Sequence, residues 1–192
     1  MKRSARRRRR LLLAGGIAAV AVVAVVLGVS GVFNHVIKEL TLPLRHEDII
    51  RQQANEKQVD ASLIAGVIYA ESRFRDQTSR AGARGLMQIT PTTAHEIERL
   101  SGGTTFKLND LSNPDINIRY GTFYLSHLLD LFDGSEVAAL AAYHAGPTAV
   151  EDWGGGGLTL DEIPLDETRD YVEEVLDKRR DYRREYAQEL GY

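Results

Sequence analysis

An uncharged stretch of 23 residues near the N-terminus, at positions 11–33, separates two parts of the 192-residue chain. A helix of this length without a charge is long enough to cross the hydrocarbon core of a bilayer. Five consecutive arginines, 6–10, precede it and Lys38 is the first charge after it, so the positive-inside rule places the N-terminus in the cytoplasm. We therefore predict a single-pass protein of the cell membrane, with a basic cytoplasmic tail (1–10), a transmembrane helix (11–33), a linker (34–44) and one extracytoplasmic domain (45–192).

Two other interpretations of the N-terminal segment stay open. A cleavable signal peptide is one, because Ser30 and Gly31 are small, although its apolar region would be shorter and a small-x-small site is not clear. A twin-arginine export signal is the other, because an arginine run precedes the apolar stretch.

The composition restricts what the extracytoplasmic domain can be. The chain has no cysteine, so the domain can use neither disulfides nor a lipid on an N-terminal cysteine. The net charge of −3 includes the basic N-terminal cluster, so the remainder is clearly acidic. The acidic charge of this domain argues against nucleic-acid binding. Without disulfides, a domain of this ordinary size must be stabilised by the packing of its core alone.

Apolar residues recur at helical spacing along this domain, and the absence of a convincing strand pattern predicts a mainly α fold. Asp60 is a suitable N-cap for the helix that leads to Glu71. Trp153 precedes four glycines, 154–157, which form either a mobile loop at a cleft edge or a plain connector. The charged face of the C-terminal helix is expected to be solvated. The helices expected besides the one before Glu71 are 48–56, 91–100, 115–132, 135–143 and 166–190.

One carboxylate, Glu71, ends an apolar helical run. Helical spacing stacks it on one face with Ile64, Val67 and Ile68, so the face points inward. Burial favours the neutral form of a carboxyl group, and an acid that is protonated near neutral pH can donate a proton to a leaving group. Glu71 is therefore a candidate general acid, and the alternative is a solvated side chain or a cap at the polar edge of the helix.

The residues after Glu71 form a loop that looks shaped for a ligand. Ser72 can cap a neighbouring backbone group, and Gly82 and Gly85 bracket a turn that needs unusual backbone angles or close approach. Gln88, expected at the start of the next helix, offers two donors and an acceptor for the amide and hydroxyl groups of a sugar.

Three motifs in order now suggest a family. Glu71-Ser72 is followed by SRAGARGLMQ at 79–88 and by AAYHAG at 141–146, with NPDINI at 113–118 and ETRDYV at 167–172 as further matches. This pattern resembles the catalytic domain of the soluble-type lytic transglycosylases, which is similar to goose-type lysozyme, over about residues 45–190. The resemblance implies a lysozyme-like helical domain.

The resemblance also implies an activity on peptidoglycan glycan strands. In such an enzyme Glu71, as the single acid and base, would protonate the oxygen between N-acetylmuramic acid and N-acetylglucosamine. It would then take the proton of the muramyl C6 hydroxyl, which closes a 1,6-anhydro ring without consuming water. No metal or cofactor is implied, and the other histidines (His35, His46, His95, His127) show no metal-ligand spacing.

The family motifs carry further roles onto individual residues. Ser79 would touch the acetamido group of the sugar, and Met87 would form apolar floor or simply fill a gap. Gln88 and Tyr143 match positions that line the cleft. The residues expected to bind substrate are Ser79, Met87, Gln88, Tyr143, His144, Glu167 and Tyr171, of which Glu167 and Tyr171 match a motif that closes one side of the groove.

Two departures from the family pattern leave alternatives open. The segment from Glu71 to Ser79 is one residue shorter than in the family pattern, and the proline usual near Asp76 is absent. His144 stands at the place of the motif asparagine. If that asparagine holds the turn, histidine tolerates similar backbone angles, and if it orients the glutamate or the sugar, the activity either falls or gains a pH dependence from the imidazole. A non-catalytic wall-binding module and a hydrolytic muramidase are therefore the alternative functions, although no convincing second carboxylate for hydrolysis is found.

Overall fold

The computed structural model describes residues 36–103 and 107–192. The chain falls into two compact units, Met1–Leu42 and Pro43–Tyr192, and the second contains the helices that concern us. The predicted cytoplasmic tail and transmembrane helix, 1–10 and 11–33, lie outside the described residues. Over the residues that are described, no helix has both the length and the apolar character that crossing a membrane requires.

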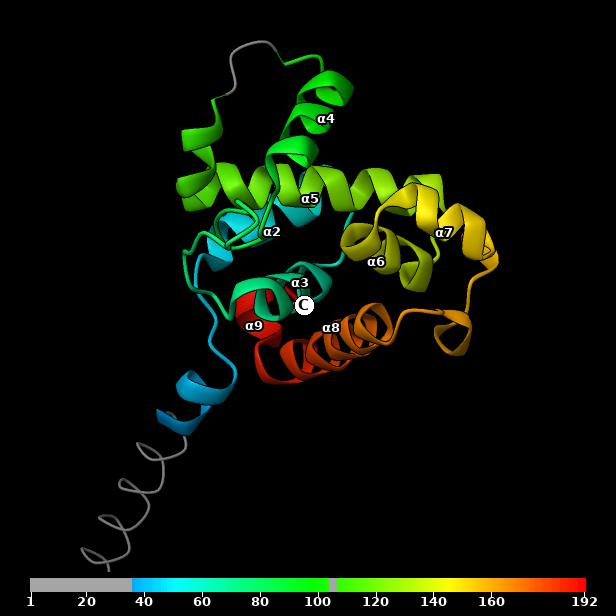
Figure 1. Ribbon diagram of the computed structural model, residues 1–192. Coiled ribbons are helices and arrows are strands. Elements are labelled where there is room, and N and C mark those ends of the chain that lie inside the picture. The colour runs from blue at the N-terminus through cyan, green and yellow to red at the C-terminus, as the bar shows by residue number, and fades with distance from the viewer. Residues whose placement is uncertain (1–35, 104–106) are drawn as a thin grey trace, which may run out of the picture. The chain divides into compact units, whose positions relative to one another are not determined.

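The unit Pro43–Tyr192 is mainly helical, as predicted (Figure 1). Each expected helix is present with small shifts in its ends, except that the predicted helix 166–190 is divided at Tyr186. The described residues contain β-structure only as two isolated bridges in the loop after Glu71. The helices are α2 (Glu47–Lys57), α3 (Ala61–Ser72), α4 (Pro91–Ser101), α5 (Pro114–Leu131), α6 (Glu136–Ala145), α7 (Pro147–Trp153), α8 (Asp166–Glu185) and α9 (Ala187–Leu190), with short 3-10 helices η1 (Leu108–Ser112), η2 (Gly155–Gly157) and η3 (Leu160–Glu162) between them.

Local sequence signals explain where the helices begin. The Asp60 side chain accepts hydrogen bonds from the backbone N–H groups of Ser62 and Leu63, which confirms its predicted role as the cap of α3. Asn113 caps α5 in the same way, and Thr90 caps α4 with a proline as the first helical residue. These caps satisfy backbone donors that have no partner inside the helix.

Helix α3, which carries Glu71, is the central element of the domain. It is buried along almost its whole length, and Figure 1 shows α8 running beside it. Gly66 permits this close packing, because a Cβ atom there would lie 2.8 Å from the carbonyl oxygen of Val175 on α8. A well-packed helix of this kind holds its last turn, and therefore Glu71, in a fixed place.

The glycines after Trp153 form a packed connection. Residues Gly155–Gly157 make the single turn η2, and a Cβ atom at Gly156 would lie 3.1 Å from the carbonyl oxygen of Phe132. The following residue, Leu158, is buried. Of the two interpretations of the glycine run, the structure therefore favours the connector.

Candidate active site

Glu71 lies in the last turn of α3, where the buried helix meets the surface. Burial raises the pKa of its carboxyl group to about 7, and the nearby hydroxyl of Tyr171 acts in the opposite direction by lowering it. The side chain keeps part of its surface exposed. A carboxyl group with this pKa is present in both protonation states near neutral pH, so it can first donate and then accept a proton.

Among the described residues, no second acid contributes to the electrostatic environment of Glu71. Its pKa is shifted by burial and by Tyr171, and no neighbouring carboxylate in the described part of the chain contributes to the shift. Asp76, the acid nearest in sequence, is exposed in the loop. The pair of facing carboxylates used by ordinary glycoside hydrolases is therefore not seen among the described residues.

Two tyrosines from other helices face Glu71. Burial is the main cause that raises the pKa of both Tyr143 and Tyr171 well above the usual value, and the charge of Glu71 adds to the effect. The Tyr143 hydroxyl donates a hydrogen bond to the carbonyl oxygen of Met87 at 2.9 Å. The buried Tyr171 hydroxyl makes no hydrogen bond of regular geometry in the described residues, although it is close enough to Glu71 to affect its pKa. Helices α3, α6 and α8 therefore converge on one carboxyl group.

The loop after Glu71 is tied directly to α3. The Ser72 hydroxyl donates to the carbonyl oxygen of Leu86 at 2.7 Å, so the residue after Glu71 holds the far end of the loop as well as its own helix. Gly82 and Gly85 have φ angles of +85° and +76°, in the left-handed region that favours glycine. The predicted turn with unusual backbone angles is thus confirmed.

A residue to which the sequence analysis gave no role, Asn117 of α5, organises this loop. Its side chain is fully buried. The Oδ1 atom accepts from the Met87 N–H at 2.8 Å, and the Nδ2 group donates to the carbonyl oxygens of Arg84 and Leu111 at 2.9 and 3.0 Å. Gly85 is needed beside it, because a Cβ atom there would lie 2.2 Å from Nδ2. The signal in the sequence was a polar amide on the apolar face of a helix, inside the motif at 113–118.

Ser79 and Gln88 brace the loop in this structure. The Ser79 hydroxyl accepts from the Ala83 N–H at 3.1 Å. Gln88 does not start a helix as expected: its φ is +45°, and α4 begins only at Pro91. Its Nε2 group donates to the carbonyl oxygens of Gln77 and Gly85 at 3.0 and 2.7 Å. Their predicted contacts with substrate stay predictions.

Met87 belongs to the core. Its side chain is fully buried and lies so close to Gly121 of α5 that a Cβ atom there would be 2.3 Å from the sulfur. Of its two predicted roles, apolar floor or gap filler, the structure favours the second. Its backbone, which binds Asn117 and Tyr143, is what connects it to the site.

His144 and Glu167 lie at the end of α6 and the start of α8. The imidazole ring stacks on the Tyr171 ring, with centroids 4.7 Å apart and 27° between the planes. Its Nδ1 atom is 3.1 Å from the Thr168 hydroxyl oxygen. His144 is exposed as a residue, but partial burial of its imidazole lowers the pKa of the ring, and the charge of the exposed Glu167 partly opposes this.

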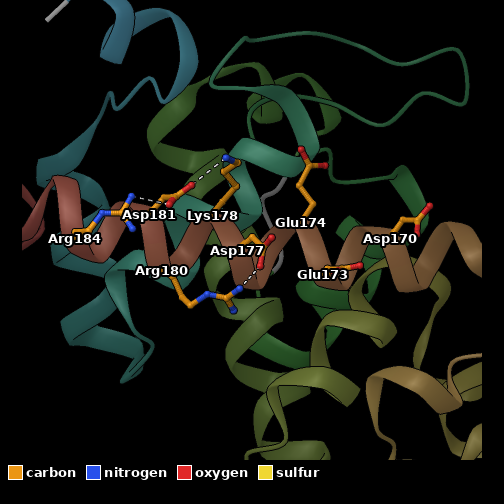
Figure 2. Close-up of a pocket in the computed structure, with 8 residues that line it drawn as sticks. All are labelled: Asp170, Glu173, Glu174, Asp177, Lys178, Arg180, Asp181 and Arg184. Carbon is orange, nitrogen blue, oxygen red and sulfur yellow. Dashed lines mark hydrogen bonds and ion pairs between the residues drawn. The ribbon is translucent and has the colours of Figure 1, made fainter. Parts of the chain in front are cut away.

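The outer face of α8 is strongly charged (Figure 2). A shallow hollow of about 530 Å³ there contains no apolar side chain in its lining, and Lys178 and Arg184 both pair with Asp181, at 3.1 and 3.0 Å. This agrees with a solvated face. The residues that line the hollow are Asp170, Glu173, Glu174, Asp177, Lys178, Arg180, Asp181 and Arg184.

No group of three or more potential ligands for a metal ion is found in residues 36–103 and 107–192.

Comparison with known proteins agrees with this arrangement. The family description "Transglycosylase SLT domain" matches residues 48–162. The soluble lytic murein transglycosylase of Escherichia coli strain K12 is 33% identical over 147 residues, which are 72% of this chain and 23% of that protein. The membrane-bound lytic murein transglycosylase E of Buchnera aphidicola is 37% identical over 112 residues, 54% of this chain and 51% of that protein.

A solved structure is similar over most of the same region. It is an inactive glutamate-to-glutamine mutant of the lytic transglycosylase Slt from Pseudomonas aeruginosa, with 34% identity and a TM-score of 0.72. The match covers 78% of this chain and 26% of that one. This chain thus spans about a quarter of the length of the Escherichia coli and Pseudomonas proteins and about half of the Buchnera protein.

Proposed function

Because the chain belongs to the transglycosylase SLT domain family, we propose that it is a peptidoglycan lytic transglycosylase with Glu71 as its single general acid and base. The observation that carries this proposal is the environment of Glu71. A carboxyl group with a pKa of about 7, between the buried Tyr171 and the half-buried Tyr143 and with no second carboxylate acting on it among the described residues, suits a reaction in which one group does both proton transfers.

In the first step the protonated Glu71 carboxyl donates to the glycosidic oxygen between N-acetylmuramic acid and N-acetylglucosamine. The bond from that oxygen to the muramyl C1 breaks, and the acetamido group of the substrate stabilises the positive charge left on C1. In the second step the Glu71 carboxylate takes the proton of the C6 hydroxyl as O6 bonds to C1. The product carries a 1,6-anhydro ring, Glu71 is protonated again, and no water is consumed.

The surrounding residues supply position in this proposal. The buried Tyr171 hydroxyl stabilises the carboxylate form of Glu71, which exists between the two steps. Tyr143, held by its hydrogen bond to the backbone of Met87, lies beside the reacting sugar as a rigid side of the cleft. Ser79 and Gln88 exchange their bonds within the loop for bonds to the acetamido and hydroxyl groups of the glycan. Glu167, in the first turn of α8, closes one side of the groove.

We further propose that residues 11–33 anchor the protein in the membrane with the catalytic domain outside the cytoplasm. The support is the uncharged stretch itself and the arginine run before it. Family members are named both as soluble and as membrane-bound proteins, so the anchor is a property to test in this chain.

The test is digestion of purified cell walls by the full-length chain in mild detergent, followed by mass spectrometry of the soluble fragments. We expect 1,6-anhydromuramyl ends from the wild type and from Asp76→Asn, which changes an exposed acid of the same loop, and none from Glu71→Gln. Reducing ends in place of anhydro ends would show a hydrolytic muramidase. Wall binding without cleavage by the wild type would show a wall-binding module, and either result would refute the proposal.

A further inference from the structure

The Tyr171 hydroxyl interacts with the Glu71 carboxyl, but no hydrogen bond of regular geometry holds it in the described part of the chain. It is buried and lies next to Glu71. Its position therefore depends on what holds the aromatic ring. The hydroxyl oxygen lies on the long axis of the ring, so it moves relative to the carboxyl group only when the whole side chain shifts, and a partner stacked on the face of the ring resists such a shift.

The face of that ring is covered by His144 from the neighbouring helix. The two rings are nearly parallel, and their centroids are 4.7 Å apart. Since His144 is in the last turn of α6 and Tyr171 is in the second turn of α8, the stack also joins the two helices that border Glu71.

The imidazole is itself held in place by Thr168. Thr168 is buried and lies three residues before Tyr171 on the same face of α8, so one helix presents both partners to His144. In the neutral ring with its proton on Nε2, Nδ1 accepts a hydrogen bond from the Thr168 hydroxyl, 3.1 Å away. The charged group that faces the imidazole is Glu167, also from α8, which is exposed to solvent.

We propose that His144 is a positioning residue that acts through Tyr171: its ring, stacked on the Tyr171 ring, sets the place of the Tyr171 hydroxyl beside the Glu71 carboxyl. His144 stands at the place where the motif that this sequence resembles has asparagine. The kinetic consequence of this positioning rests on the proposed function. The contact between the three side chains does not, and it can be measured separately.

The kinetic test compares His144→Ala, which removes the ring, with His144→Phe, which keeps a ring able to stack but has no Nδ1. A positioning defect acts on the chemical step, so we expect kcat for wall cleavage to fall about tenfold in the alanine variant, with KM changed less than about twofold. The phenylalanine variant should recover most of this loss. His95→Ala, a histidine exposed on α4, serves as the control and should match the wild type.

The second test needs no activity. The pKa of Glu71 is followed by ¹³C NMR of the side-chain carboxyl in the full-length chain, with Glu71→Gln to assign the signal. Since the Tyr171 hydroxyl lowers this pKa, loosening it in His144→Ala should raise the pKa by about half a unit or more, and His144→Phe should stay close to the wild type.

An unchanged or lowered pKa in His144→Ala would overturn the inference, as would a phenylalanine variant no better than alanine in both tests. If the wild type cleaves no wall material, the proposed function fails, and the NMR titration still decides whether His144 positions Tyr171. If cleavage is normal and the pKa is insensitive to His144, only the present inference fails.

Discussion

Glu71 should destabilise the folded domain at neutral and alkaline pH, and replacing it with glutamine should reveal by how much. The ordinary pKa of a glutamate, 4.5, applies to the unfolded chain, whereas burial raises the pKa in the folded protein to about 7. Between these values the folded protein binds more protons than the unfolded chain, so stability falls as the pH rises through this range. Above pH 7 the full cost of a buried carboxylate is present.

The size of this effect follows from the shift in pKa. A difference of about 2.5 units corresponds to about 3.4 kcal/mol at about 1.36 kcal/mol per unit. Because Glu71 keeps part of its surface in solvent, we expect about 2 kcal/mol. Glu71→Gln should therefore have nearly the stability of the wild type at pH 4 and be more stable by about 2 kcal/mol at pH 8.

Urea unfolding of the full-length protein measures this difference. The single tryptophan, Trp153, lies in the domain at the end of α7, so its fluorescence follows the unfolding of this part of the chain. Asp76→Asn is the matched control, and as an exposed change it should alter stability by less than about 0.5 kcal/mol at either pH. If Glu71→Gln and the wild type differ by the same amount at pH 4 and pH 8, Glu71 is not a buried acid, and the reasoning about its chemistry fails with it.

Three further changes test other parts of the structure. Asn117→Leu breaks three hydrogen bonds from a buried amide to the backbone of the loop and η1 and should cost about 3 kcal/mol or more, seen as a lower Tm; a loss below about 1 kcal/mol would contradict the role given to Asn117. Gln58→Gly, at the end of α2 where φ is +55°, relieves a left-handed residue and should raise stability by up to about 1 kcal/mol in urea unfolding, and a loss would show that the side chain matters more than the strain. Tyr171→Phe removes the hydroxyl that lowers the pKa of Glu71, so the alkaline limb of the pH profile of kcat/KM should move to higher pH; a limb that stays in place or moves down would be inconsistent with the contact.

The helices could be predicted from the sequence because their signals are local. Asp60 was expected to cap α3 and does so, since a cap needs only the backbone of the next two or three residues. The inward face of α3 likewise follows from the spacing of apolar residues alone. The break at Tyr186, which divides the last helix, has no such signal: Tyr186 fits the same apolar stripe as Tyr182.

The loop after Glu71 was predicted only in part, because its shape is set from a distance. Gly82 and Gly85 predicted unusual backbone angles, and both residues have positive φ. The position of Gln88, in contrast, depends on a left-handed turn that is stabilised by bonds to Gln77 and Gly85. The anchoring amide of Asn117 comes from α5, and helical spacing cannot tell which loop an inward-facing amide will meet.

The convergence on Glu71 depends even more on distant parts of the chain. The spacing of apolar residues predicts that Tyr143 and Tyr171 lie on the helix faces that point into the domain. Only the packing of α8 against α3 and α6 brings their hydroxyls to the same carboxyl group. That packing depends on Gly66, which lies more than a full turn before Glu71 and carries no chemistry. A larger residue at Gly66 would push α8 outward and move Tyr171 away from Glu71 while every side chain of the site remained intact. The proton chemistry of Glu71 is therefore a property of how three helices pack, which explains why motifs can identify its residues but cannot give its pKa.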